Sequence, residues 1–510
     1  MAYDPFNGRG LRYPLWINRD TGLIDGADYI RASDGGLDTS ETDPGASART
    51  ANNAAILALA AQGKVILWDV DVCWHSQIWA SNDAAADADP SAAQDLIVVG
   101  AVGQLWTSDT RSYKSLPRIL GEDGTTSPGC AWKLTGASQL YGLRIEKPSA
   151  TARDSTPATT QHGISIHNGR GYVLQDVQVF RSAASGVLVQ ATNYNDLTDT
   201  LESTGGFFFN VDTISTMGDG IVIGNGTNHH LSDHCRVIQP GDDYYPTLWN
   251  NDAKEVTDVH IRHCQGWGQS VAGRALGHIT GRRITWSYVN IRDTVGNASI
   301  IGGEASVNGC EDVLVDHCYI GASPTSGIIL DISSGTGSGT LKEVSGLTIS
   351  NTVFGPGGDI GYVRGVVSDF TLDANTFQGY NDHLLLRGIE NLTITDNAFA
   401  AILANNTIID WDGSSAPDEG SGTLVISGNS FAEFGTNNTY RCILLDDYVS
   451  EMTITIGPNL YTGTNVPIEF LRANFAFGIG SGTYDQTGTI ALGTASAVAQ
   501  DYTAPGFTVI

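Results

Sequence analysis

The chain has 510 residues, of which 61 are glycine, 41% are hydrophobic and only 16% are charged. This composition argues against a disordered chain and is typical of a folded, turn-rich protein. The formal net charge of -28, from 55 acidic and 27 basic residues, argues against nucleic acid and anionic membrane surfaces as partners. It also disfavours polyanionic sugars, so a neutral or cationic glycan is the easier ligand.

Residues 1–5 contain neither a basic nor a long apolar segment, and no stretch reaches the roughly 18 apolar residues of a membrane span. We therefore expect a protein made in the cytoplasm without a signal peptide.

The seven cysteines are widely spread without a Cys-x-x-Cys spacing, which predicts reduced, mostly buried thiols instead of disulfides or a zinc site. No cofactor is expected.

Two short regions precede the main part of the chain. Residues 1–50 contain clusters of Gly, Pro, Asp, Ser and Thr with little periodicity, which predicts an extended or loop-built N-terminal arm. Residues 51–63 are rich in alanine, have apolar residues at helical spacing and end at Gly63. We expect a short helix there that caps the open edge of the strands beginning at residue 64.

From about residue 165 to 456 one pattern recurs: an apolar residue, another two positions later, and Asn, Cys or Thr three positions after that. Successive copies end 54, 34, 23, 22 and 32 residues apart, which suits one turn of a parallel β-helix if the first step covers two turns. Stacked turns bury a continuous core that one turn alone cannot form. We therefore predict an all-β fold, a parallel β-helix, over residues 64–460. The repeat resembles that of the right-handed, pectin-lyase-like solenoids, which implies the same handedness here. The copies lie at residues 259–264, 313–318, 347–352, 370–375, 392–397 and 424–429.

The last region, residues 461–510, loses this pattern and is rich in Gly, Thr, Ala and Val. A bare β-helix end exposes unpaired strand edges. We expect a strand-rich cap there that also holds copies of the chain together.

The cysteines and histidines of the repeat carry a structural prediction. Cys264 and Cys318 share the ladder position of the repeated asparagines, which predicts small buried residues. Because strand alternation sends neighbouring side chains to opposite faces and the spacing matches no known site, no metal site is predicted among the histidines. These are His229, His230, His234, His260 and His263.

Three aspartates suggest chemistry: Asp219, between two glycines, and the pair Asp242-Asp243 after Gly241. Asp219 and Asp242 are 23 residues apart, about one turn, so stacked strands at roughly 4.8 Å spacing bring them to one outer face. Inverting hydrolysis of a glycosidic bond needs a protonated and an ionised carboxyl group about 6.5–9.5 Å apart. Crowding raises the pKa of one such carboxyl group. The alternative interpretation is a solvated acidic turn.

The segment from residue 217 to 271, with Gly218-Asp219-Gly220, Gly241-Asp242-Asp243 and Gly266-Trp267-Gly268, resembles the catalytic core of the β-helical inverting glycoside hydrolases. That group includes polygalacturonases, dextranases and α-1,3-glucanases. The resemblance implies that Asp219, Asp242 and Asp243 form the acid and base machinery. We expect Asp242 to be the general acid and the other two to hold and deprotonate water.

The same segment departs from polygalacturonases, which have a histidine where this chain has Trp267 and a later basic motif that it lacks. Acidic pectin-type substrates are therefore not expected. The expected substrate-binding residues offer apolar faces for sugar rings, a hydrogen-bond donor and a further acid. They are Tyr244, Tyr245, Trp249, Trp267, Arg274 and Glu304.

The order of arm, short helix, β-helix and strand-rich tail resembles tailspikes and receptor-binding fibres of tailed phages. The resemblance implies attachment to a phage or gene-transfer-agent particle through the arm, recognition or cleavage of bacterial capsule or lipopolysaccharide by the β-helix, and a homotrimer. The expected location is the particle surface. Two alternatives are a non-catalytic receptor-binding spike with an inactive acidic site and a bacterial enzyme unrelated to particles.

Overall fold

In the computed structural model the chain falls into two compact units. Unit 1 comprises Met1–Tyr245 and Ala253–Gln265, and unit 2 comprises Pro246–Asp252 and Gly266–Ile510. No helix among the described residues is long and apolar enough to cross a membrane. The described residues are 27–42, 44–75, 78–79, 96–100, 116, 118–121, 132–146, 162–250, 253–268, 274–292, 294, 299–302, 308–321, 330–333, 343–355, 359–378, 382–402, 408–411, 421–433, 441–445, 452–456, 459–462, 466–470, 482–484 and 507–509.

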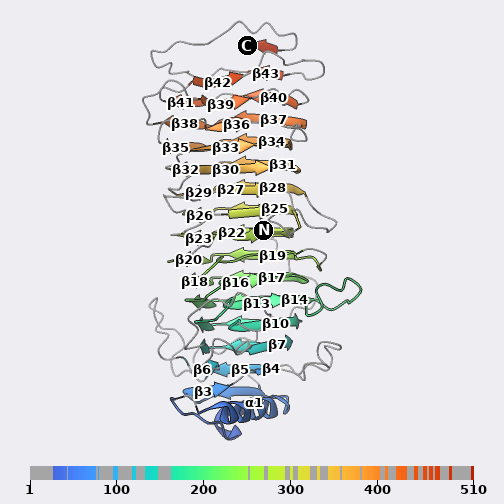
Figure 1. The fold of residues 1–510 in the computed structure, drawn as a ribbon, viewed down its shortest axis with the longest axis vertical. Coiled ribbons are helices and arrows are strands. Elements are labelled where there is room, and N and C mark those ends of the chain that lie inside the picture. Colours follow the sequence, from blue (N-terminus) through green and yellow to red (C-terminus); the bar gives the residue numbers. More distant parts are fainter. Residues whose placement is uncertain are drawn as a thin grey trace. The chain divides into compact units, whose positions relative to one another are not determined.

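Unit 1 is a coil of three parallel sheets, in which each strand pairs with the equivalent strand of the next turn (Figure 1). The first sheet contains β1 (Tyr29–Arg31), β2 (Val65–Trp68), β5 (Ile97–Gly100), β8 (Gln139–Tyr141), β11 (Val173–Gln175), β14 (Ser203–Phe209), β17 (Thr227–Asp233) and β19 (Thr257–Arg262). The second contains β3 (Val72–His75), β6 (Arg118–Gly121), β9 (Arg144–Glu146), β12 (Gln178–Phe180), β15 (Asp212–Ile214) and β18 (Arg236–Ile238). The third contains β4 (Ile78–Trp79), β7 (Trp132–Gly136), β10 (Ile164–Gly169), β13 (Val187–Gln190) and β16 (Ile221–Ile223).

Unit 2 has the same three-sheet, all-parallel coil. Its first sheet contains β22 (Gly281–Ser287), β25 (Cys310–Asp316), β28 (Val344–Ser350), β31 (Val367–Asp373), β34 (Ile389–Thr395), β37 (Ser421–Ser427), β40 (Met452–Ile456), β43 (Gly482–Tyr484) and β44 (Phe507–Val509). Its second contains β23 (Asn290–Ile291), β26 (Tyr319–Ile320), β29 (Val353–Phe354), β32 (Thr376–Gln378), β35 (Ala398–Ile402), β38 (Ser430–Glu433) and β41 (Leu460–Thr462). Its third contains β21 (His278–Ile279), β24 (Ser299–Gly302), β27 (Leu330–Ser333), β30 (Asp359–Arg364), β33 (Asp382–Leu386), β36 (Ile409–Trp411), β39 (Arg441–Leu445) and β42 (Val466–Phe470). The boundary between the units falls within β20 (Gln265–Trp267), a strand of the second sheet.

The predicted parallel β-helix is thus confirmed, and its repeat has the expected inward face. Leu392 and Ile394 of β34 are fully buried. Asn397 accepts a hydrogen bond from the Asn375 backbone N–H at 2.9 Å and donates its own side-chain N–H to Asn429 at 3.0 Å. A second ladder stacks four phenylalanine rings at 4.9–5.1 Å between centroids. These rings belong to Phe354, Phe377, Phe399 and Phe431.

The predicted capping helix exists but starts earlier. Helix α1 spans Ala46–Ala60, with Ile56 and Leu59 buried. Strand β1 pairs with β2, so part of the segment expected to be a loop-built arm belongs to the first turn of the coil. The attachment role of the arm stays a prediction, and residues 1–26 lie outside the described residues.

The C-terminal segment continues the strand pairing. Strand β42 pairs in parallel with β39, β43 with β40, and β44 with β43. The described cysteines are free and buried, as expected, and Cys130 lies outside the described residues. Self-association through this segment stays a prediction.

The bend between the first and second sheets interrupts the alternation of side chains along the strands. Between the first and second sheets of the two units, nine non-glycine residues, each from a different turn, have a left-handed backbone with φ between 49° and 57°. We call this the corner position, and the residue after it is buried, as in His234-Cys235. The non-glycine corner residues are Asp176, Asn210, His234 and His263 in unit 1, and Tyr288, His317, Asn351, Ala374 and Asp396 in unit 2.

Candidate functional site

The three predicted acids converge in unit 1, where Asp219, Asp242 and Asp243 form what we call the acidic centre. One carboxylate oxygen of each lies within 4.8 Å of the others. Asp219 and Asp242 are half-buried and Asp243 is buried. The structure thus brings together the residues that the one-turn spacing paired, while their catalytic role stays a prediction.

Stacking of two successive turns positions these acids. The backbone N–H of Gly241 donates to the Gly218 carbonyl at 2.9 Å, and the N–H of Gly220 donates to the Asp243 carbonyl at 2.8 Å. The Asp219 side chain links the turns further, because its Oδ1 accepts the Asp243 backbone N–H at 3.1 Å. Its Oδ2 accepts the Ser185 hydroxyl at 3.2 Å, from one turn earlier. Both contacts suit an ionised carboxylate, which only accepts hydrogen bonds.

The glycines around the acids are required by close backbone packing. A Cβ at Gly220 would lie 2.3 Å from Val237 Cγ1 and 2.6 Å from the Tyr244 carbonyl oxygen. A Cβ at Gly241 would lie 2.2 Å from the Met217 carbonyl oxygen. Such distances are shorter than any stable contact between these atoms, so the Gly-Asp-Gly and Gly-Asp-Asp sequences have a structural cause that is independent of catalysis.

The prediction that the aromatic residues following the acids in sequence bind sugar rings is wrong. Tyr244 and Tyr245 are fully buried and Trp249 is 4% exposed, so none offers a ring face to a ligand. The chain turns inward directly after Asp243, and the Tyr245 hydroxyl lies within hydrogen-bond distance of the Cys235 and Gln265 carbonyls, at 3.0 and 2.7 Å. Burial raises the pKa of Tyr245 well above its ordinary value.

The remaining predicted substrate-binding residues stay predictions. Trp267 and Arg274 are half-buried residues of unit 2. Glu304 lies outside the described residues.

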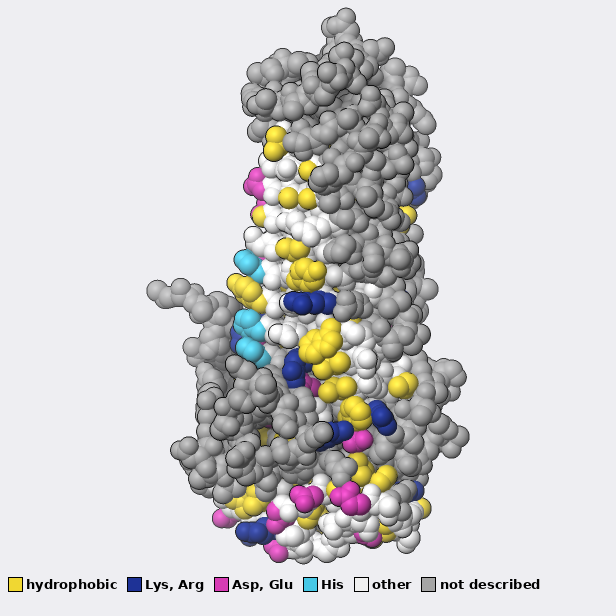
Figure 2. Space-filling view, turned by 90° about the vertical axis from the view of Figure 1, so that its left-hand side faces the viewer, with side chains coloured by type: hydrophobic (Ala, Val, Ile, Leu, Met, Phe, Trp, Pro, Cys, Tyr) yellow, Lys and Arg dark blue, Asp and Glu magenta, His cyan; other side chains and the backbone are white. Residues whose placement is uncertain are grey.

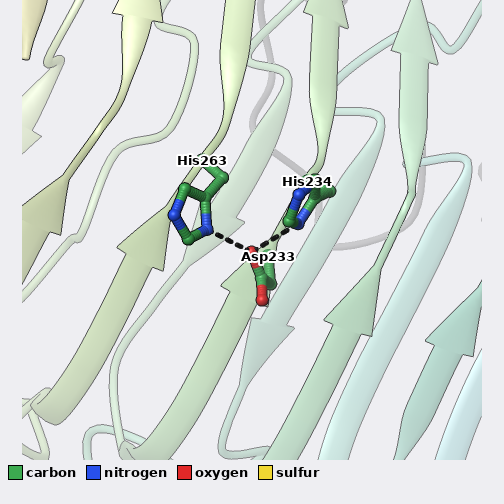
Figure 3. A group of neighbouring side chains, drawn as sticks. All are labelled: Asp233, His234 and His263. Carbon is green, nitrogen blue, oxygen red and sulfur yellow. Dashed lines mark hydrogen bonds and ion pairs between the residues drawn. The ribbon is translucent and has the colours of Figure 1, made fainter. Parts of the chain in front are cut away.

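A second cluster, which the sequence did not predict because strand alternation was expected to separate its members, combines Asp233, His234 and His263 in unit 1 (Figure 3). Asp233 Oδ1 lies 2.7 Å from His234 Nδ1 and 3.0 Å from His263 Nδ1. Arg262 contacts the other oxygen, with Nε at 3.0 Å and Nη2 at 2.9 Å from Oδ2. We call these four residues the His–Asp cluster.

Asp233 carries the negative charge of this cluster. Burial alone would raise the pKa of Asp233, but the His263 hydrogen bond and the Arg262 guanidinium outweigh it and lower that pKa. The imidazoles are accessible, with 52% of the His234 side chain and 43% of the His263 side chain exposed. Figure 2 shows histidine side chains at the protein surface.

The expectation that neighbouring side chains here point to opposite faces is wrong at the corner position. His234 has φ 55° and His263 has φ 52°, and this left-handed backbone lets His234 reach the same side as Asp233. A signal was present in the sequence, where the dipeptide His-Cys occurs at residues 234–235, 263–264 and 317–318. In each copy a buried ladder cysteine follows an outward corner histidine.

No family model matches this chain, and no curated protein matches it. Solved structures that resemble it include the catalytic domain of a GH87 alpha-1,3-glucanase, with a TM-score of 0.46 and 10% identity over 91% of this chain and 70% of that chain. The N-terminal fragment of gene product 12 of bacteriophage Phi29 has a TM-score of 0.48 and 10% identity over 89% and 81%. A tailspike protein of E. coli bacteriophage HK620 has a TM-score of 0.39 and 10% identity over 90% and 78%. Similarity at this level assigns no substrate or activity to this chain.

Proposed function

We propose that this protein cleaves a neutral or weakly charged bacterial surface polysaccharide by hydrolysis at the acidic centre. The observation that supports this proposal is the convergence of three carboxyl groups from two successive turns within 4.8 Å. A net charge of -28 favours neutral over acidic sugars.

In the proposed reaction Asp242 donates a proton to the glycosidic oxygen while the bond from that oxygen to the anomeric carbon breaks. A water molecule held by Asp219 and Asp243 attacks the anomeric carbon, and one of these carboxylates takes its proton. The hydrogen bonds from Ser185 and from the Asp243 backbone hold Asp219 in place for this role. Positioned acid and base groups of this kind contribute roughly 10²–10⁴-fold each to a rate.

The stereochemical course is a separate part of the proposal. The oxygens of the acidic centre lie closer together than the roughly 6.5–9.5 Å that is usual between the carboxyl groups of inverting enzymes. Retaining enzymes have carboxyl groups about 5–5.5 Å apart. We propose inversion on the resemblance of residues 217–271 to inverting hydrolases, although this spacing is nearer that of retaining enzymes. Proton NMR of the first product formed distinguishes the two courses. Retention would show that one acid attacks the sugar directly.

We further propose that the chain acts as a spike or fibre of a phage or phage-like particle, as a homotrimer attached through its N-terminal region. This part rests on the order of regions in the sequence. Sedimentation of the full chain tests it: a trimer is expected, and a stable monomer would contradict it.

A second candidate function, binding of the polysaccharide without cleavage, is favoured by one observation. The glycines of the acidic centre are explained by backbone packing, and Asp219 hydrogen-bonds the next turn. The acids could therefore hold the coil together while the surface binds a receptor.

The deciding experiment measures new reducing ends in surface polysaccharides from candidate host bacteria. We expect release by the wild type and at least about a 100-fold loss for Asp242→Asn and for Asp219→Asn. Ser185→Ala leaves all three acids in place and should reduce the rate about tenfold through looser positioning of Asp219. The matched control Asp71→Asn, at an exposed acid of unit 1, should act like the wild type. A wild type that binds polysaccharide but releases no sugar would establish the second candidate.

A further inference from the structure

We propose that Asp233, His234 and His263 bind a divalent transition-metal ion of the Zn²⁺ class on the outer surface of unit 1. The two imidazoles and the carboxylate come from consecutive turns, and their candidate ligand atoms all lie within 4.8 Å of one another. This site is separate from the acidic centre and shares no residue with it.

The distances fit a metal with little adjustment. In a tetrahedral site with bonds of about 2.0–2.1 Å, neighbouring ligand atoms are roughly 3.3 Å apart. Asp233 Oδ1 lies 2.7 Å from His234 Nδ1 and 3.0 Å from His263 Nδ1, so small side-chain rotations open the required space. A metal at Nδ1 requires the lone pair of that atom, so each imidazole would bind as the tautomer with its proton on Nε2.

The donor set determines the class of ion. Two imidazole nitrogens with one carboxylate oxygen suit Zn²⁺, Co²⁺ and Ni²⁺, whereas Ca²⁺ and Mg²⁺ prefer oxygen ligands alone. Arg262 holds Asp233 Oδ2 through both Nε and Nη2, which orients Oδ1 toward the histidines. A partner that orients a ligand in this way supports metal binding from outside the coordination sphere.

The exposure of the cluster leaves room for a solvent ligand. The His234 and His263 side chains are 52% and 43% exposed, while Asp233 lies beneath them at 9%. Three protein ligands and one open position are typical of zinc sites that exchange water. The site would therefore accept a fourth, exchangeable ligand from solution.

The chain contains a matched control for this site. His317 of unit 2 occupies the same corner position, with φ 52°, and its Nδ1 lies 2.7 Å from Asp316. The next turn contributes no histidine there: Asp316 Oδ1 instead accepts Ser350 Oγ at 2.7 Å and Asn351 Nδ2 at 2.9 Å. One histidine and one acid form a weak metal site at most.

The test titrates Zn²⁺ into the full chain without a polyhistidine tag, after removal of metals by a chelator. We expect one saturable site per chain by calorimetry, and Co²⁺ in its place should give the visible absorption of a four-coordinate nitrogen and oxygen site. His234→Asn and His263→Asn should each weaken binding at least about tenfold. Asparagine is chosen because Asn210 and Asn351 already occupy corner positions, so these variants are expected to fold.

The control variants address other histidines. His317→Asn should leave the affinity unchanged, and so should His229→Asn, which removes a separate histidine whose Nδ1 lies 3.6 Å from Asp258. Absence of saturable binding to the wild type would overturn the proposal. Binding that survives in both His234→Asn and His263→Asn, with circular dichroism like that of the wild type, would overturn it equally. Sugar release plays no part in these measurements.

Discussion

Asp243 donates its backbone N–H to the Oδ1 carboxylate oxygen of Asp219 at 3.1 Å. In return, the carbonyl of Asp243 accepts the N–H of Gly220, the residue that follows Asp219, at 2.8 Å. The two acids are therefore joined by the same backbone contacts that stack one turn of the coil on the next. Any change in the distance between these turns must also change the separation of the acids.

The first prediction concerns Gly220→Ala. The added Cβ would meet Val237 Cγ1 at 2.3 Å and the Tyr244 carbonyl oxygen at 2.6 Å, so the turns must move apart. We expect a loss of about 1–3 kcal/mol in the free energy of unfolding, measured by urea denaturation. If the proposed function holds, sugar release should fall as well.

Gly321→Ala is the matched control for this change. A Cβ at Gly321 would meet its nearest atoms at 3.4 Å, which is an ordinary van der Waals distance. We expect an effect within about 0.5 kcal/mol. Equal destabilisation by the two variants would show that close packing at Gly220 is not the cause.

The second prediction concerns pH and the buried histidine His230. Burial, with a smaller effect of His260, lowers the pKa of His230 to about 3. Its ring bonds Tyr172 Oη at 2.9 Å through Nδ1 and Ser232 Oγ at 2.8 Å through Nε2. In the unfolded chain a histidine binds a proton below a pKa of about 6.5, whereas folded His230 stays neutral until about pH 3. The free energy of unfolding should therefore fall as pH drops from about 6.5 toward 3, by up to about 1.4 kcal/mol per pH unit from this group.

His230→Gln tests the assignment because glutamine is polar but does not titrate. The variant should be less stable at pH 7, yet its stability should decline less steeply between pH 6.5 and 4 than that of the wild type. Buried His167, whose pKa is also lowered by burial, keeps part of the slope in both proteins. An unchanged slope in the variant would contradict the role of His230.

The third prediction is a stabilising change at the corner position. Ala374 is exposed and has φ 55°, a conformation that costs an ordinary L-residue about 1–2 kcal/mol. Ala374→Asn introduces the residue found at the same position one turn earlier, Asn351, and should raise the free energy of unfolding by about 0.5–1 kcal/mol. Ala374→Val should lower it, because β-branched residues tolerate this backbone least. A lower urea midpoint for Ala374→Asn than for the wild type would contradict the interpretation.

The coil was predictable because its core repeats in the sequence. Residues equivalent to Leu392, Ile394 and Asn397 recur in the same order at intervals close to one turn. In this copy all three are buried, as expected. The convergence of Asp219 with Asp242 and Asp243 follows from the same spacing. The coil and the meeting of the acids were both predictable because, in a periodic backbone, the number of residues between two positions tells whether they lie on the same side of successive turns.

Two features of the site depend on local backbone direction instead, and there the predictions from sequence are wrong. Tyr244 and Tyr245 follow the acids directly, but the chain turns into the core after Asp243 and buries both rings. Asp233 and His234 are neighbours that share a side, because the left-handed corner interrupts alternation. Neither turn interrupts the hydrophobic pattern, and the corner leaves its trace instead in the His-Cys dipeptide that recurs at residues 234–235, 263–264 and 317–318.

The corner position separates the surface of each turn from its interior. Aspartate, asparagine, histidine, tyrosine and alanine all occupy it with nearly the same φ. Asp176 and Asn210 are buried, but the other seven corner residues are exposed, and a substitution at one of these alters the outer surface while the buried residue that follows keeps its place in the ladder. Evolution can therefore revise this line of outward side chains one turn at a time, so that new binding properties arise without rebuilding the fold.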